Sequence, residues 1–387
     1  MIDQKRKAAI VGVYTTEQAR GLERSIWSLE LEAIKGALAE AGLSHTQVDG
    51  LIPMDYDTPI SLHMAWTEQL GGHPISYMSI GNASGGVAKA ASAIETGLAN
   101  VVVIYFGNAN NPNGPRQLKM LDRAPRVKDW MFLVHGAYMS VWYAMWTQLY
   151  LHEFKAERDY FAEYSVKMRE NAMLNPASLM GSRGPITIED VYASRMIASP
   201  LHLFECSLDN DGGYAIVVAS EELARDCKTK PIWVIGGAEA MYTDGYQTIT
   251  APWNDPRGAA VKRATEIAFG RAGITHDDID VAGLYDCFAI TVVRNLEEMG
   301  FCKLGEGADY MHEGHLWLDG KMPSNTDGGL LANSHNGNPS GMHTIEVVRQ
   351  LRGECGARQV KDPKIGVSLA QGASVHGLAG VAVLARD

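Results

Sequence analysis

An internal repeat constrains the fold of this chain more than any other feature of its sequence. The segment at 41–49 (AGLSHTQVD) matches the segment at 272–280 (AGITHDDID), and each leads from a helical pattern into a short apolar run. A Ser-Gly pair at 84–85 has a counterpart at 340–341, and each pair opens a predicted helix that precedes a strand. Two matches in the same order predict a duplicated fold whose halves differ in loop length.

Strand and helix patterns alternate along the first hundred residues. Short apolar runs at 8–14, 48–52 and 101–106 predict buried strands. The intervening segments 25–41 and 82–97 have the period or the Ala-rich composition of helices. This β-α-β order predicts an α/β protein with parallel strands buried beneath helices.

The repeat divides the chain into two expected halves, residues 1–225 and residues 226–387. Residues 107–200 interrupt the alternation, so we expect them to form a loop or cap insertion in the first half. Within them, the Trp-, Tyr- and Met-rich segment 134–154 predicts a helix on a large apolar surface. That helix is either ordinary core, or the lining for a bulky apolar substrate or a subunit contact.

Composition excludes several classes of protein. Of 387 residues, 46% are hydrophobic, which is typical of a globular chain with a sizeable core. The net charge of -11 argues against a general binder of nucleic acids or anionic membranes. Five scattered cysteines favour a reducing compartment. Since no apolar run is long enough for a signal peptide or a membrane span, we expect a cytoplasmic protein.

Common cofactor motifs do not occur in the sequence. The glycines at 81–86 lack the dinucleotide-binding spacing, and neither a P-loop nor a G-x-S-x-G motif is found. His312 and His315 have a spacing that could ligate a metal, but no third ligand is evident. We therefore expect no metal site and no tightly bound cofactor.

Unusual motifs are concentrated in the C-terminal half. They are Tyr285-Asp286-Cys287-Phe288, PSNTDGG at 323–329, SHNGNPSG at 334–341, QLRG at 350–353, and Gln371-Gly372. In these motifs the sequence resembles the thiolase superfamily, and within it the sterol-carrier-protein-X thiolases and the lipid-transfer-protein-type aldolases. The resemblance extends over nearly the whole chain. It implies a five-layer α-β-α-β-α fold of two pseudo-symmetric halves, in agreement with the repeat.

The resemblance also implies which catalytic groups are missing. Thiolases carry a nucleophilic Cys two residues before a Ser-Gly pair, at the N-terminus of a buried helix, and this position holds Asn82. Their acid/base Cys falls on Ala370, and the Asn of their Asn-Glu-Ala-Phe motif falls on Tyr285. Of the usual set, only the His of the Gly-His-Pro motif remains, as His335. Because an amide is no nucleophile and Ala moves no proton, covalent Claisen chemistry should be lost.

The remaining candidates for catalysis are Tyr285 and His335, which lie on converging loops in this family. Retro-aldol cleavage needs a base for a β-hydroxyl proton and a donor for the enolate, but no nucleophile. His335 is the better base candidate because histidine titrates near working pH. Asp286 is expected to orient either group, and Cys287 to be a packing residue. The alternative interpretations are a core tyrosine and a structural loop histidine.

The function predicted from these residues is a carbon–carbon lyase. It would cleave a bulky β-hydroxyacyl-CoA, such as a steroid side-chain thioester, with CoA as part of the substrate. An acyltransferase or condensing enzyme that works with a partner, and a non-catalytic CoA-binding scaffold, are the alternatives. The resemblance implies a homodimer with a small OB-fold and zinc-ribbon protein attached. The predicted substrate-binding residues are Asn82, Ser84, Ser340, Gly341 and Gly372.

Overall fold

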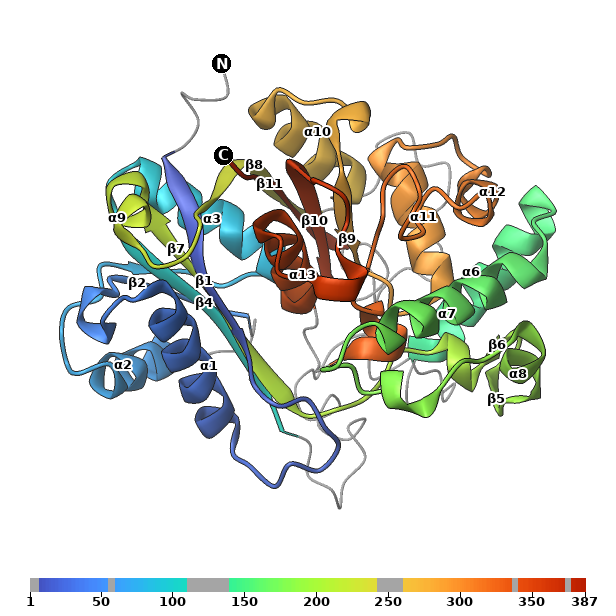
Figure 1. The fold of residues 1–387 in the computed structure, drawn as a ribbon, viewed down its shortest axis with the longest axis horizontal. Coiled ribbons are helices and arrows are strands. Elements are labelled where there is room, and N and C mark those ends of the chain that lie inside the picture. The colour runs from blue at the N-terminus through green and yellow to red at the C-terminus, as the bar shows by residue number, and fades with distance from the viewer. Residues whose placement is uncertain (1–6, 55–59, 110–138, 242–259, 336–339, 373–376) are drawn as a thin grey trace.

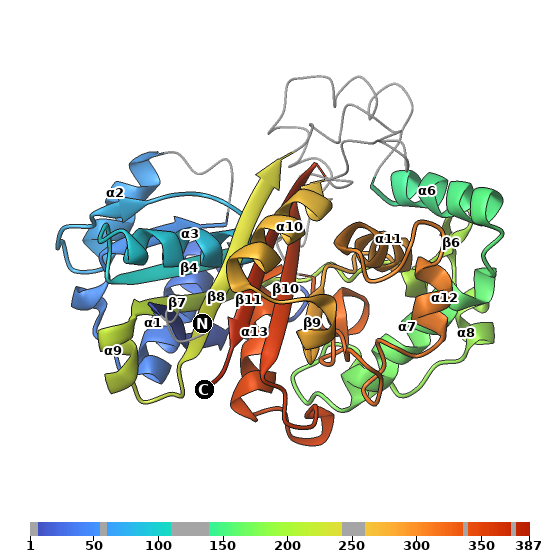
Figure 2. The same ribbon diagram turned by 90° about the horizontal axis from the view of Figure 1, so that it is seen from above.

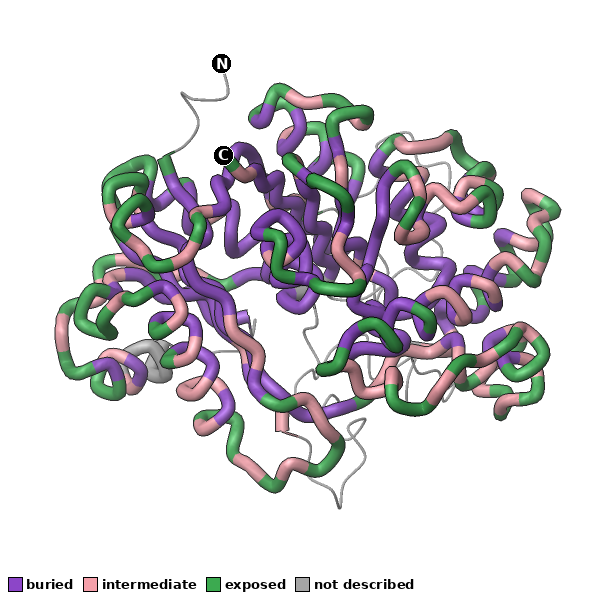
Figure 3. Tube along the Cα trace, viewed as in Figure 1, coloured by how far each residue is buried: buried purple, intermediate pink, exposed green. Residues whose placement is uncertain are grey.

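In a computed structural model of the protein, most of the chain forms one mixed α/β body (Figure 1). The structure describes residues 7–54, 60–109, 139–241, 260–335, 340–372 and 377–387. Figure 3 shows that the buried residues follow the sheet and the helices packed against it, whereas the exposed residues gather on the outer turns and helices. Among the described residues, no helix is long and apolar enough to cross a membrane.

A nine-stranded sheet runs through the molecule in the order β3-β2-β4-β7-β1-β8-β11-β10-β9. Its strands are β1 (Ala8–Thr15), β2 (Gly50–Pro53), β3 (Tyr77–Met78), β4 (Val101–Asn108), β7 (Gly212–Ser220), β8 (Ile232–Met241), β9 (Val281–Leu284), β10 (Ile365–Gly372) and β11 (Leu378–Ala385). A separate hairpin consists of β5 (Met196–Ala198) and β6 (Leu201–His202).

The strand pairing repeats between the two halves of the sheet. In the first half, β7 pairs antiparallel with both β1 and β4, and β4 pairs parallel with β2. In the second half, β11 pairs antiparallel with both β8 and β10, and β10 pairs parallel with β9. A short antiparallel pairing of β1 with β8, at Ala9 and Trp233, joins the halves. The duplicated fold predicted from the sequence repeat is therefore confirmed.

Helices cover both faces of each half-sheet. The outer helices are α1 (Ile26–Ala41), which packs on β1, β7 and β4, and α10 (Ala260–Ala272), which packs on β8 and β11 (Figure 2). The inner helices α3 (Ala83–Glu95) and α13 (Ser340–Arg352) contact strands of both halves. This arrangement gives the expected order of helix, sheet, inner helices, sheet and helix.

The local structure at the repeated segment explains why the sequence is repeated. The helices α1 and α10 are followed by Gly42 and Gly273, whose φ angles of 78° and 69° require the left-handed region that glycine tolerates. Asp49 then accepts the first backbone N–H groups of β4, at 2.8–2.9 Å. Asp280 accepts the first N–H groups of β10 in the same way, at 2.7–2.9 Å. Each carboxylate thus fixes the start of a central strand.

The remaining elements lie around this double framework. They are α2 (Ile60–Gln69), α6 (Met139–Phe154), α7 (Arg158–Met173), α8 (Ile188–Ala193), α9 (Glu221–Asp226), α11 (Ala289–Met299), α12 (Gly307–His312) and the short turns η2 (His45–Gln47), η3 (Gly181–Arg183), η4 (Leu203–Glu205), η5 (His276–Asp278), η6 (Gly329–Asn333) and η7 (Gly356–Arg358). Of these turns, η6 is a single π-helical turn and the others are 3-10 turns.

The aromatic helix α6 belongs to the core. Trp142, Tyr143, Trp146 and Tyr150 are each at most 4% exposed. Tyr143 stacks on Phe288, with ring centroids 4.5 Å apart. The core interpretation of the segment 134–154 therefore holds for these side chains, and residues 134–138 lie outside the described part of the chain.

Candidate functional site

Tyr285 lies at the edge of the sheet where β9 ends. Because β9 and β10 run parallel with Leu284 opposite Leu369, Tyr285 follows its strand beside Ala370. Its side chain is half-buried and packs against the main apolar cluster. The sheet register therefore brings together two positions that the sequence predicted to be catalytic in thiolases.

Asp286, the next residue, joins three elements through its buried carboxylate. It is 0% exposed. Its Oδ2 accepts a hydrogen bond from the Tyr164 hydroxyl of α7 at 2.9 Å, and its Oδ1 accepts from the Leu330 N–H of η6 at 3.0 Å. Nε2 of His343, on α13, lies 3.2 Å from the same Oδ1. Asp286 thus fixes the loop of Tyr285 against the turn that leads to His335.

Tyr164 and Asn325 clamp the residue before Tyr285. The Asn325 amide accepts the Leu284 N–H and donates to the Leu284 carbonyl, both at 2.8 Å. It also donates to the Tyr164 hydroxyl at 3.0 Å. Burial, reinforced by the negative charge of Asp286, raises the pKa of Tyr164 well above its usual value, so this hydroxyl remains a donor.

The turn η6 carries the chain to His335, and Asp327 holds this turn in place. Asp327 accepts the Gly329 N–H at 3.0 Å and the Asn333 side-chain amide at 2.6 Å. The backbone N–H of His335 donates to Asn210 Oδ1 at 2.9 Å, and the His335 side chain is half-buried. Two buried carboxylates therefore hold this short turn: Asp327 bonds its first and last residues, and Asp286 bonds Leu330 between them.

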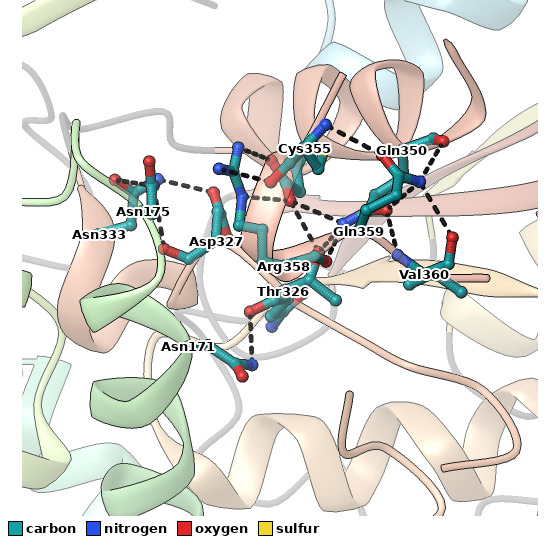
Figure 4. Close-up of polar contacts among 12 residues, drawn as sticks. Asn171, Asn175, Thr326, Asp327, Asn333, Gln350, Cys355, Arg358, Gln359 and Val360 are labelled. Carbon is teal, nitrogen blue, oxygen red and sulfur yellow. Dashed lines mark hydrogen bonds and ion pairs between the residues drawn. The ribbon is translucent and has the colours of Figure 1, made fainter. Parts of the chain in front are cut away.

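A polar network surrounds Asp327 (Figure 4). Burial, together with the negative charge of Glu346, raises the pKa of Asp327 to about 6. Glu346 is paired with the Arg358 guanidinium at 2.9 Å and accepts the Thr326 hydroxyl at 2.7 Å. Gln350, from the QLRG motif, donates to Thr326 at 2.9 Å. The motif residues thus support the site through hydrogen bonds within the protein.

Asn82 occupies the N-terminus of α3 and uses its side chain within the protein. It is 0% exposed, and its Oδ1 caps the helix by accepting the Gly85 N–H at 2.7 Å. Its Nδ2 donates to the Ala370 carbonyl at 3.5 Å, and its backbone N–H donates to Glu239 at 3.2 Å. The two positions where thiolases carry cysteines are therefore in contact here, and a structural amide joins them.

Ser84 belongs to a buried hydroxyl cluster between the two halves. Its Oγ lies 2.9 Å from Ser368 Oγ and 3.4 Å from Thr344 Oγ1, and the latter two are 2.8 Å apart. All three residues are 0% exposed. The cluster connects α3, α13 and β10. A role for Ser84 in substrate binding stays a prediction.

The other predicted substrate-binding residues lie at the ends of elements. Ser340 begins α13, and Gly341 packs so closely on the ring of Tyr214 that a Cβ there would overlap it. Gly372 ends β10. The loops that adjoin Ser340 and Gly372 lie outside the described residues, and the binding roles of these three residues stay predictions.

The cysteines offer no activated thiol. Burial raises the pKa of Cys287 to about 11, and it raises the pKa values of Cys206 and Cys302 to about 12. Burial also raises the pKa values of Cys227 and Cys355. Because the thiolate is the nucleophilic form, none of these thiols is poised to attack at neutral pH.

In the described part of the chain, no group of three His, Cys, Asp or Glu side chains converges, at His312 and His315 or elsewhere. Nδ1 of His312 lies 2.6 Å from the Glu163 carboxylate. Nε2 of His315 lies 3.1 Å from Glu313. The two imidazoles therefore contact different carboxylates.

Sequence reasoning missed three residues that support the site, namely Tyr164, Asn325 and His343. Asn325 lies in the PSNTDGG motif at 323–329, and His343 follows the repeated Ser-Gly pair by two residues, where the first repeat has Val87. Tyr164 is 122 positions from Asp286, and no local pattern connects them.

Comparison with known proteins identifies the family. Residues 246–386 match the family described as "Thiolase C-terminal domain-like". The chain is 35% identical over 362 residues to a steroid side-chain-cleaving aldolase of Thermomonospora curvata, covering 89% of this chain and 90% of that one. It is 36% identical over 364 residues to a 17-hydroxy-3-oxo-4-pregnene-20-carboxyl-CoA lyase of Mycobacterium tuberculosis, covering 90% and 92%.

A solved structure described as an Ltp2-ChsH2(DUF35) aldolase superposes with a TM-score of 0.86 at 31% identity. The match covers 99% of this chain and 98% of that one. The chain therefore belongs to the thiolase superfamily. Within it, the chain is a member of the branch that contains the steroid side-chain-cleaving aldolases and the sterol-carrier-protein-2 thiolases.

Proposed function

We propose that this protein is a carbon–carbon lyase that cleaves a bulky β-hydroxyacyl-CoA by a retro-aldol reaction. The observation that carries the proposal is the set of groups where β9 and β10 end. A buried amide cap at Asn82, in contact with Ala370, stands where thiolases have cysteines. Beside Ala370, Tyr285 belongs to a loop that the Asp286 carboxylate ties to the turn before His335. Such a site has acid/base groups but no covalent nucleophile.

The reaction starts with removal of the β-hydroxyl proton, which we assign to the imidazole of His335. The oxygen lone pair then forms a carbonyl as the bond between the α and β carbons breaks. The electron pair of that bond passes to the α carbon as a thioester enolate, which the Tyr285 hydroxyl stabilises by a hydrogen bond. Protonation of the α carbon releases a shorter acyl-CoA and a ketone or aldehyde. Asp286 does not touch substrate in this scheme and acts by orienting the two loops.

The class of substrate follows from the relatives. The two curated relatives are named for steroid side-chain cleavage and for a 17-hydroxy steroid carboxyl-CoA. We propose a substrate of the same kind, a steroid side-chain thioester of CoA with a β-hydroxyl group. CoA is then a part of the substrate, with Ser340, Gly341 and Gly372 near its acyl end.

The proposed assembly contains a second protein. The similar solved structure is an aldolase together with a DUF35 protein. We propose that this chain forms a homodimer and binds a partner of the same type, a small protein with an OB-fold and a zinc ribbon that completes the CoA site. The reducing cytoplasm is the compartment that we propose for the complex.

The test is release of a ketone from 17-hydroxy-3-oxo-4-pregnene-20-carboxyl-CoA by the chain and its partner together. The matching 17(20)-enoyl thioester serves as the control. It should not react, because it has no hydroxyl proton whose removal could start the cleavage. Thiolysis of a 3-oxoacyl-CoA without cleavage of the hydroxyacyl-CoA would instead favour an acyltransferase. Binding of CoA thioesters without turnover of either would favour a scaffold.

A further inference from the structure

His343 is a buried histidine that the proposed reaction does not use. It lies in the first turn of α13 and is 1% exposed. Its Nε2 is 3.2 Å from Asp286 Oδ1. Within the described residues, neither ring nitrogen has a hydrogen-bond partner of good geometry. A buried polar ring that lacks such bonds lowers stability, so its presence calls for a reason beyond packing.

The repeat provides an internal control for this position. When the Ser-Gly pairs at 84–85 and 340–341 are aligned, His343 coincides with Val87 of α3. Val87 is 0% exposed and packs in the inner apolar cluster. The fold therefore accepts an aliphatic side chain at this point of an inner helix, and the imidazole is a feature of the second half alone.

The groups around the imidazole of His343 indicate its role. The groups that face it are the carboxylates of Asp286 and Asp327, with the Tyr164 hydroxyl beside the first. Glu346 lies beyond Asp327 and is already paired with Arg358. Tyr164 and Leu330 give Asp286 neutral donors, and a buried carboxylate is strongly unfavourable unless polar groups surround it. In the described part of the chain, the imidazole of His343 is the further polar group that lies against this carboxylate.

We propose that His343 is a positioning residue, which holds the Asp286 carboxylate in place and so holds the loop of Tyr285 against the turn before His335. Asp286 accepts from Tyr164 and Leu330 at once, and its Oδ1 is the atom that lies against the imidazole. Without the imidazole the carboxylate loses its contact on that side, which would weaken one of these bonds. This inference rests on the proposed lyase function and adds to it a residue that acts without contact with substrate.

The experiment compares three variants of the full chain with its partner. His343→Val introduces the residue of the first repeat, His343→Gln keeps an N–H donor without charge, and Val348→Ala makes a cavity at a fully buried position of the same helix. Values of kcat and KM are measured for each. Hydrogen–deuterium exchange of the Leu330 amide reports on the loop without any need for activity.

For His343→Val we expect kcat to fall about 10–100-fold, as for other supporting residues of a site. KM should change by less than about threefold, because no contact with substrate is lost. The Leu330 amide should exchange faster. His343→Gln should restore part of the protection, and Val348→Ala should lower Tm without either change.

Two results would overturn the inference. One is a His343→Val variant with wild-type kcat and wild-type Leu330 exchange. The other is a Val348→Ala variant that reproduces both changes, which would make the effect one of general stability. If the wild type cleaves no β-hydroxyacyl-CoA, the lyase proposal fails, but Leu330 exchange in His343→Val still decides whether His343 controls Asp286.

Discussion

The two halves of the molecule use the same backbone positions for opposite purposes. The residue after β2 is Met54, which is 1% exposed and lies in one apolar cluster with Val87 of α3. The residue after β9 is Tyr285, followed by a buried Asp286 in contact with His343 of α13. At these described positions the first half has buried hydrocarbon, at Met54 and Val87, whereas the second half has a half-buried tyrosine and a buried histidine beside a carboxylate.

This difference separates what the fold requires from what the chemistry requires. Hydrocarbon at a matched position is sufficient for stability, because replacing buried charged groups by well-packed hydrocarbon often stabilises a protein. We therefore interpret Met54 and Val87 as framework residues, and Tyr285 and His343 as residues of the proposed site. Substitutions at matched positions of the two halves test this interpretation.

The largest effect should come from the reacting groups themselves. Tyr285→Phe and His335→Ala should each lower kcat about 10²–10⁴-fold at nearly unchanged Tm, because each removes proton transfer or enolate stabilisation. The fold-loss in kcat of the double variant should be smaller than the product of the two single fold-losses, because removing one member of a cooperating pair already disables the other. Met54→Leu, at the matching position of the first half, should leave kcat unchanged. Wild-type kcat in both single variants would place the active site elsewhere.

A smaller loss should follow from disturbing Asp286 through the backbone. Gly329 has a φ of 58°, and a Cβ there would overlap the Asp286 carboxylate. Gly329→Ala should therefore lower kcat about 10–100-fold, in the range seen for supporting residues of a site. Gly97→Ala is the control, because Gly97 has a φ of 75° with no atom near its Cβ position. Equal kcat values for the two variants would contradict a role for the turn.

The pH dependence of stability should reveal the second carboxylate of the turn. The pKa of Asp327 is raised to about 6 in the folded protein, above its unfolded value, so the folded state binds more protons between pH 4 and 6. Its contribution to stability is therefore complete below pH 4 and is lost as pH rises through 6. Urea unfolding of the wild type should show a fall over this range that Asp327→Asn lacks. Parallel curves would show that Asp327 is ionised throughout.

The smallest effect is expected at the helix cap. Asn82→Ala should lower the free energy of unfolding by about 0.5–2 kcal/mol, the usual cost of losing an N-cap. Thermal unfolding measures this loss. Asn82→Cys should restore no thiolysis of acetoacetyl-CoA, because the second thiol is still missing at Ala370. Thiolysis by this single variant would show that a thiol at position 82 is sufficient for thiolase chemistry.

The framework could be predicted from the sequence because its signals are local. The repeated nonapeptide marks a helix end and a capped turn, and both depend on residues within ten positions of each other. Its aspartate also fixes a strand start, although the N–H groups that it accepts lie 51–52 positions away for Asp49 and 84–85 positions away for Asp280. The predicted strand at 48–52 forms at Gly50–Pro53 instead, because Asp49 is used to hold the start of β4. Asn82 was predicted at a helix N-terminus and caps α3 there.

The network around Asp286 could not be predicted, because its members come from distant parts of the chain. Tyr164 is on α7, Leu330 is in η6 and His343 is on α13. A tyrosine in a helix has no pattern that distinguishes a carboxylate partner from an ordinary core site. Only the tertiary fold brings these groups together, and family resemblance indicated the loops but not their support.

The inner helices have a consequence for how such a protein arose. Since α3 packs on β8 and β11 as well as on its own half, each half supplies part of the other's cover. A single ancestral half would have left its inner helix exposed to water and would have needed a second copy of itself. Joined in one chain, the two halves make the interior that a separate half would have found only at an interface with a second copy.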